Sequence, residues 1–214
     1  APTLYAQGGH GFFRYGVLDS HFSQRVREGR LIRATREGKM DYGFGVDENT
    51  ALVVSQPDAS GSVSMSVLGA GGVFVVDVRQ AVDTAPSSAG YAIQGVKAHY
   101  LIQGDRLQIG ADGNLTVQLA THIARPVLPA SASAPPVAQN RVLDYGSANF
   151  LKMVRQMGLT GAAQAVGTNA DSQDTRATQT TRFSVTATRT ADTLFRGTDE
   201  RVSYTNLQLA IRPE

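Results

Sequence analysis

Short runs of β-branched and aromatic residues, separated by glycine turns, dominate the sequence from Tyr42 to about Leu119. "YGFGV" and "TALVV" flank Asp47, Glu48 and Asn49, and "SVSMSVLGAGGVFVVDV" first alternates and then becomes continuously apolar. "YAIQGVKAHYLIQGDRLQI" has the pattern of a hairpin. Strands that are apolar on both faces need cover on both sides, so this region predicts a sheet inside a layered fold.

A helix-like segment precedes the first of these strands. An apolar run leads into "DSH", after which apolar side chains recur at near-helical spacing from Phe22 onward. Asp19 or Ser20 can cap such a helix through its first-turn amides. His21 is therefore expected at a strand-to-helix junction, which is where ligands bind in open α/β sheets.

A change of composition divides the chain. "RPVLPASASAPPVAQN", at 125–140, is expected to be an extended, poorly packed linker between a domain at 1–124 and an extension at 141–214. In the extension, "SANFLKMVRQMG" predicts a helix capped by Ser147 and ended by Gly158. A polar loop, "GTNADSQDTRATQTT", and two β-type runs complete the extension. The two runs are expected to pair with each other, packing on the core, or to close a sheet edge.

Composition excludes several classes of protein and site. A formal charge of +2 is too small for general binding to nucleic acid, and no apolar run of about eighteen residues could span a membrane, so neither partner is expected. The absence of cysteine removes disulfides and thiol catalysis. No metal-ligand spacing and no cofactor pattern occurs; "LGAGG" lacks the spacing of a nucleotide loop and predicts a β-turn.

The basic residues are concentrated beside one histidine. Six of the seventeen arginines lie between Arg14 and Arg36, directly around His21. A histidine, a carboxylate and several guanidinium groups can supply a general base, its orienting partner and an anion clamp. Glu48, Asp47 or Asp19 can orient the ring, and spacing alone does not choose between them. The alternative interpretation is a solvated basic helix face.

The other histidines, His10, His99 and His122, are interpreted as structural or surface residues.

"VLDSHFSQRVREGRLIR" followed by "GFGVDENTALVV" resembles the cyanophycinase family of serine peptidases. "VLGAGGVFVVD" and "GVKAHYLIQGDRLQI" are similar to later strands of that family, and the resemblance covers roughly residues 9 to 110. It implies an α/β fold like the class I glutamine amidotransferases, with a flavodoxin-like sheet, a strand-rich C-terminal half and an extra α+β tail.

The resemblance also implies roles for individual residues. His21 would be the general base and Glu48 its orienting carboxylate, while Arg25, Arg27 and Arg30 would line the substrate pocket. The implied substrate is cyanophycin, a poly-aspartate carrying arginine on each side chain, which such enzymes cut into β-aspartyl-arginine dipeptides. Ser20 stands where the family has a substrate-binding glutamine, so the identity of the acidic or β-aspartyl peptide substrate is open.

The family's nucleophilic serine lies in a Gly-x-Ser-x-Gly elbow upstream of the histidine, and this sequence has no such elbow. Ser88 in "PSSAGYA" and Ser147 in "YGSANF" follow the histidine and are rejected as nucleophiles. Because the sequence begins without Met, we expect an N-terminal fragment or separate chain, released by autoprocessing, to supply the serine, and this chain alone to be inert.

Three alternatives are kept. They are the peptidase just described, a non-catalytic binder of anionic peptides, and a related β-aspartyl peptidase. A homodimer is a further possible partner arrangement. The trimmed start, the lack of cysteine and the polar tail favour a secreted or periplasmic protein, with a cytoplasmic location as the alternative.

Overall fold

The structure is a computed structural model that describes residues 9–84, 91–121, 124–169, 182–199 and 201–214. Its helical elements are a 3-10 turn, η1 (Ser23–Arg25), and two α-helices, α1 (Glu28–Glu37) and α2 (Asn149–Thr160). The strands are β1 (Val17–Ser20), β2 (Tyr42–Val46), β3 (Thr50–Val54), β4 (Val63–Gly69), β5 (Gly72–Asp77), β6 (Val82–Asp83), β7 (Ile93–Ile102), β8 (Arg106–Ile109), β9 (Leu115–Gln118), β10 (Val137–Gln139), β11 (Gln164–Thr168), β12 (Phe183–Thr188), β13 (Leu194–Thr198) and β14 (Arg201–Pro213).

The strands form two sheets. A 10-stranded mixed sheet has the order β1-β2-β5-β7-β14-β12-β11-β10, with β13 paired to β14 and β6 paired to β7. Its parallel pairs are β1 with β2 and β10 with β11, and the other pairs are antiparallel. A smaller antiparallel sheet has the order β3-β4-β8-β9. The protein is therefore α/β, rich in strands and poor in helices.

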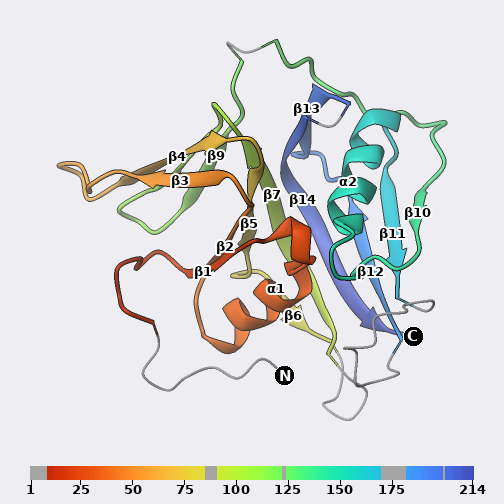
Figure 1. Ribbon diagram of the computed structural model, residues 1–214, viewed down its shortest axis with the longest axis horizontal. Coiled ribbons are helices and arrows are strands. Elements are labelled where there is room, and N and C mark those ends of the chain that lie inside the picture. Colours follow the sequence, from red (N-terminus) through yellow and green to blue (C-terminus); the bar gives the residue numbers. More distant parts are fainter. Residues whose placement is uncertain (1–8, 85–90, 122–123, 170–181, 200) are drawn as a thin grey trace.

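The side chains of β5 point alternately to the two faces of the large sheet and so hold three layers together, namely the helices, the large sheet and the small sheet. Phe74 and Val76 point into a core with α1 and α2, whereas Val73 and Val75 point into a second core against the small sheet. All six residues of β5 are buried because both faces are covered. Figure 1 shows α1 and α2 on one side of the large sheet, with the β3–β4 hairpin projecting away from it. Among the described residues, neither helix is long and apolar enough to cross a membrane.

The strand-dominated region from Tyr42 onward is confirmed, but the hairpin predicted from 91 to 109 is wrong. β7 belongs to the large sheet, whereas β8 pairs with β4 and β9 in the small one. Asp105, in the turn between them, is buried, and its carboxylate accepts from the amides of Ile102 and Ala120 at 2.9 and 2.7 Å. These bonds turn the chain out of one sheet and into the other.

The helix predicted directly after His21 begins later. Val26 adopts φ 48° and separates η1 from α1, whose N-cap is Arg27. Neither Asp19 nor Ser20 caps it; the Asp19 carboxylate accepts from Arg27 instead.

The second helix is confirmed with different ends. α2 stops at Gly161 rather than Gly158, and Ala148 is its N-cap, although the Ser147 hydroxyl does accept from the Asn149 amide at 3.2 Å. Gly158 stays helical because Phe195 packs on it: a Cβ there would lie 2.6 Å from the ring.

The expected pairing of the last two β-type runs is confirmed, since β12 pairs with β14. The segment 125–140 is more ordered than expected: Arg125 is buried, and β10 within it pairs with β11. Ser88, His122 and the core of the predicted polar loop, 170–181, lie outside the described residues. The domain boundaries stay a prediction.

Candidate active site

Parallel pairing of β1 and β2 brings the two predicted chemical segments together. The register joins Ser20 to Val46, so both strands end side by side and the next residues, His21 and Asp47, begin adjacent loops. Gly45, in β2, leaves room for the ring of Phe22, the residue after His21, because a Cβ there would lie 2.3 Å from that ring. Polar side chains that follow neighbouring parallel strands converge at one edge of a sheet, and His21 lies just after a strand, at the kind of junction that the sequence predicted.

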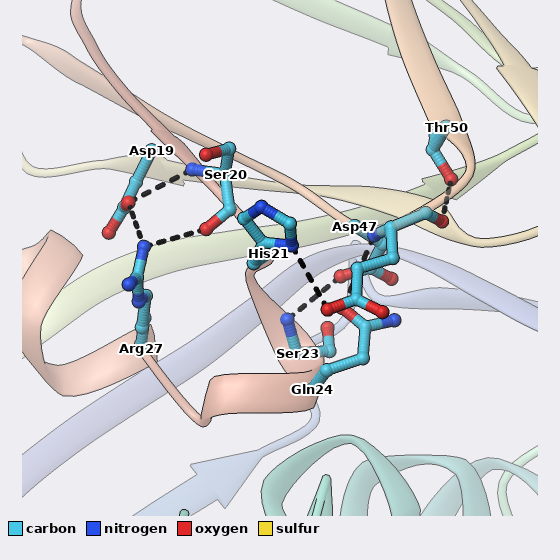
Figure 2. Close-up of polar contacts among 9 residues, drawn as sticks. Asp19, Ser20, His21, Ser23, Gln24, Arg27, Asp47 and Thr50 are labelled. Atoms are coloured by element: carbon cyan, nitrogen blue, oxygen red, sulfur yellow. Dashed lines mark hydrogen bonds and ion pairs between the residues drawn. The ribbon is translucent and has the colours of Figure 1, made fainter. Parts of the chain in front are cut away.

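His21 and Glu48 are in contact across these loops. The Nδ1 atom of His21 lies 3.0 Å from Oε1 of Glu48 (Figure 2), and the two side chains are 52% and 44% exposed. His21 and Asn49 both adopt left-handed backbone, with φ 49° and 53°. Residues other than glycine rarely adopt this region, and such strain is concentrated at functional sites. A carboxylate at Nδ1 leaves Nε2 as the nitrogen that can accept a proton.

The two other carboxylates that spacing left open have different partners. Asp47 is 4% exposed and its oxygens accept from backbone amides and from a tyrosine, so it faces inward. Asp19 faces the arginines, accepting from Nη1 of Arg27 at 2.7 Å. Glu48 is the carboxylate that touches the imidazole.

The predicted substrate-binding residues lie around the same loop. Arg27 donates through Nη1 to both Asp19 and the carbonyl of Ser20, each at 2.7 Å, so it ties the end of β1 to the start of α1. Arg30 is 57% exposed and lies 3.4 Å from Asp19 through Nε. Arg25 stacks over Tyr145 at 6.0 Å from the ring centroid. Ser20 is exposed and is brought beside His21 by chain connectivity.

Sequence reasoning missed three side chains that shape these loops. The amide of Gln24 accepts from the Glu48 backbone N–H at 3.3 Å, and Thr50 donates to the Glu48 carbonyl at 3.1 Å. The third, Tyr100, donates to Asp47 at 2.6 Å. Tyr100 comes from β7, 53 positions after Asp47, and no local pattern marks it.

A buried group of ionisable side chains lies behind the site. Burial, with the charge of Asp47 adding, raises the pKa of Glu28 to about 8. Burial also raises the pKa of Tyr100 and of Tyr204 well above the usual value, with Asp47 next in importance for Tyr100 and Glu28 for Tyr204. The field of Arg155 acts on both tyrosines in the opposite direction. Burial therefore favours the neutral forms of Glu28, Tyr100 and Tyr204.

His99, interpreted from the sequence as a structural or surface residue, lies in β7 and is 3% exposed, and burial lowers its pKa to about 4. It accepts from the Asn206 amide at 3.3 Å and makes no contact with His21 or Glu48 in the part of the chain that is described.

A groove of about 510 Å³ lies on the other, open face of the large sheet and shares no residue with the loops around His21. It is lined mainly by amides and hydroxyls, including Gln94, Gln164, Gln208, Thr186 and Thr188. Within the described ranges, no cluster of three or more metal-ligating side chains is found.

Several known proteins with sequences similar to this chain are cyanophycinases. The chain is 30% identical over 105 residues to a cyanophycinase of Trichormus variabilis and to one of a Nostoc species, which covers 47% of this chain and 34% of each relative. It is 35% identical over 106 residues to a cyanophycinase of Synechococcus elongatus, covering 50% of this chain and 30% of the relative. The chain thus spans about a third of the length of the curated relatives it matches. No family model matches it. No solved structure matches it either.

Proposed function

We propose that this chain is part of a cyanophycinase-like serine peptidase that hydrolyses cyanophycin to β-Asp-Arg dipeptides. The observation that carries the proposal is the 3.0 Å contact between His21 Nδ1 and Glu48 Oε1 at the carboxyl ends of two parallel strands. The similarity to cyanophycinases over about half of the chain supports the substrate class. A class I amidotransferase-like arrangement of the complete sheet is part of the same proposal.

In this proposal His21 moves the proton. Glu48 holds the Nδ1–H, so Nε2 takes the proton of a serine hydroxyl as that oxygen attacks the peptide carbonyl. The imidazolium that forms is stabilised by Glu48 and gives the proton to the departing amine, which leaves the acyl group on the serine. Water, losing a proton to the same Nε2, then attacks this ester, and the proton passes to the serine oxygen as the acid product leaves. The serine comes from an upstream segment or a separate chain carrying Gly-x-Ser-x-Gly.

The basic residues beside the dyad supply the binding part of the proposal. Arg25, Arg27 and Arg30, with Ser20, hold the free carboxylates of the polymer. Arg30 is 57% exposed and lies 3.4 Å from Asp19 through Nε, and a guanidinium carries five N–H donors, so this side chain can also bind a second carboxylate.

The test uses the complete product of the coding region, with purified cyanophycin as substrate and dipeptide release followed by mass spectrometry. His21→Asn, which tolerates the left-handed backbone, should abolish turnover, and Glu48→Gln should lower kcat by about 10² to 10⁴-fold. His10→Ala, an exposed histidine outside the site, is the matched control. Turnover at the unaltered rate in His21→Asn would end the proposal.

A second candidate function is binding of anionic peptides without catalysis. The observation that favours it is the absence of Gly-x-Ser-x-Gly from the 214 residues. Mass analysis of the purified protein for a companion fragment with that elbow separates the two functions. A third, closely related function, cleavage of β-aspartyl dipeptides, is motivated by Ser20 and is read from the same assay with such dipeptides as substrate.

A further inference from the structure

The carboxylate of Asp47 joins the two loops that carry His21 and Glu48. Its Oδ1 accepts from the backbone amide of Ser23 at 2.8 Å, and its Oδ2 accepts from the amide of Gly72 at 3.1 Å. Ser23 lies two residues after His21, and Asp47 itself precedes Glu48. Figure 2 shows the carboxylate of Asp47 directed at Ser23, with a dashed line to the Ser23 nitrogen.

Tyr100 completes this arrangement from the centre of the large sheet. Its hydroxyl donates to Oδ2 of Asp47 at 2.6 Å, and the tyrosine is 1% exposed. A buried carboxylate is tolerated only when its oxygens are satisfied, and here three donors from three different elements satisfy them. The bonds are protected from water, so they hold their geometry better than exposed bonds do.

The glycines of "LGAGG" make room for these two side chains. A Cβ at Gly71 would lie 2.7 Å from Cβ of Asp47, and one at Gly72 would lie 2.5 Å from the Tyr100 ring. The turn predicted from this motif is therefore also a cradle for Asp47 and Tyr100, which accounts for the paired glycines without any nucleotide.

We propose that Asp47, held by Tyr100, is the positioning residue that fixes His21 against Glu48; its catalytic meaning rests on the proposed function. The imidazole and the Glu48 carboxylate are each about half exposed, and an exposed ion pair alone restrains its partners weakly. The restraint on His21 comes from the buried carboxylate of Asp47, which accepts from the backbone amide of Ser23. The other link between the loops, from Glu48 N–H to Gln24, is longer and exposed.

Asp47→Asn is the decisive substitution because it keeps the shape and removes one acceptor. Both oxygens of Asp47 accept a backbone N–H, so an asparagine must direct its NH₂ group at one of the two amides. Loss of the bond to Ser23 frees the loop of His21, and loss of the bond to Gly72 loosens Asp47 itself, which directly precedes Glu48. Gln24→Ala is the matched control, because it removes the exposed link and leaves the buried one.

The first readout is the imidazole tautomer, measured by ¹⁵N NMR at about pH 8, above the ordinary titration range of histidine. The His21 signals are identified by their loss in His21→Asn. We expect the wild type and Gln24→Ala to hold the Nδ1–H tautomer, and Asp47→Asn to show a mixture of both. In the cyanophycin assay Asp47→Asn should lower kcat at least about tenfold with KM unchanged within about twofold.

A folded Asp47→Asn protein with the wild-type tautomer and kcat would overturn the proposal. If this variant does not fold, Tyr100→Phe decides, since it removes one donor and leaves both amides bonded; an unchanged tautomer there also overturns it. The tautomer is read on the protein without substrate. A wild type that fails to cut cyanophycin therefore refutes the proposed function and leaves the positioning role to be judged by NMR.

Discussion

Glu28, the first residue of α1, should make the stability of this protein fall as the pH rises. The side chain is 2% exposed, and its Oε2 has no hydrogen-bond partner among the described residues. Burial, with Asp47 adding, raises its pKa from an ordinary 4.5 to about 8. The folded state therefore keeps a proton that the unfolded state releases between these two values. Stability is lost as the pH rises through this window, because the unfolded carboxylate is solvated and the buried one is not.

The perturbation is Glu28→Gln, which removes the titration and keeps the size of the side chain. Each unit of pKa difference corresponds to about 1.4 kcal/mol. Between about pH 5 and about pH 7 the wild type should lose about 2 to 3 kcal/mol of unfolding free energy relative to the variant. Urea unfolding followed by circular dichroism at each pH gives this difference.

Other ionisable groups also contribute to the dependence of stability on pH, and comparing the wild type with Glu28→Gln separates their contributions from that of Glu28. Asp47, Tyr100 and Tyr204 share the buried region with Glu28, and the charge of the half-buried Arg155 acts on both tyrosines. Burial lowers the pKa of His99 to about 4, so its contribution to the unfolding free energy is lost as the pH falls. This dependence is opposite in sign to that of Glu28. All of these are present in both proteins and cancel in the difference to first order.

Leu31→Val is the matched control for Glu28→Gln, since Leu31 lies on the buried side of the same helix and carries no charge. The unfolding free energy of Leu31→Val should lie below that of the wild type by the same amount at every pH. Parallel profiles for the wild type and Glu28→Gln would refute the reasoning.

Three further outcomes are expected. Arg125→Met should destabilise the fold by about 3 to 5 kcal/mol in urea unfolding, because it leaves the fully buried Asp105 carboxylate without its ion pair; a loss below about 1 kcal/mol would contradict this. Gly45→Ala should lower the melting temperature and disturb the His21 signals in NMR, since the added Cβ meets the Phe22 ring, and an unchanged spectrum would argue against that contact. Arg30→Ala should raise KM for cyanophycin and leave kcat nearly unchanged, and an unaltered KM would return this arginine to a solvated helix face.

The contact between His21 and Glu48 could be anticipated because its causes are short-range in sequence. Two strands, each followed at once by a polar residue, and one helix between them suffice to place the side chains together. Residue spacing could not choose Glu48 over Asp47, a choice that only the family resemblance implied, because the direction of each side chain depends on which one finds buried donors. Tyr100, the strongest of those donors by distance, comes from β7.

The start of α1 and the exit from β7 could not be predicted for a related reason. Val26 adopts φ 48°, which a β-branched residue rarely does and which no local signal indicates. The turn after β7 is decided by Asp105, whose partners include Ala120 and Arg125, far along the chain. Local patterns predict elements well, whereas these features depend on tertiary contacts.

The position of β14 bears on how the molecule can be made. This strand pairs with β7 on one side and β12 on the other, and Tyr204 lies opposite Tyr100. A ribosome must therefore deliver about a hundred further residues after β7 before that strand gains its second neighbour, and such distant pairings slow assembly. Until then β7 presents an unpaired apolar edge, the kind of surface on which chaperones act and from which aggregates grow.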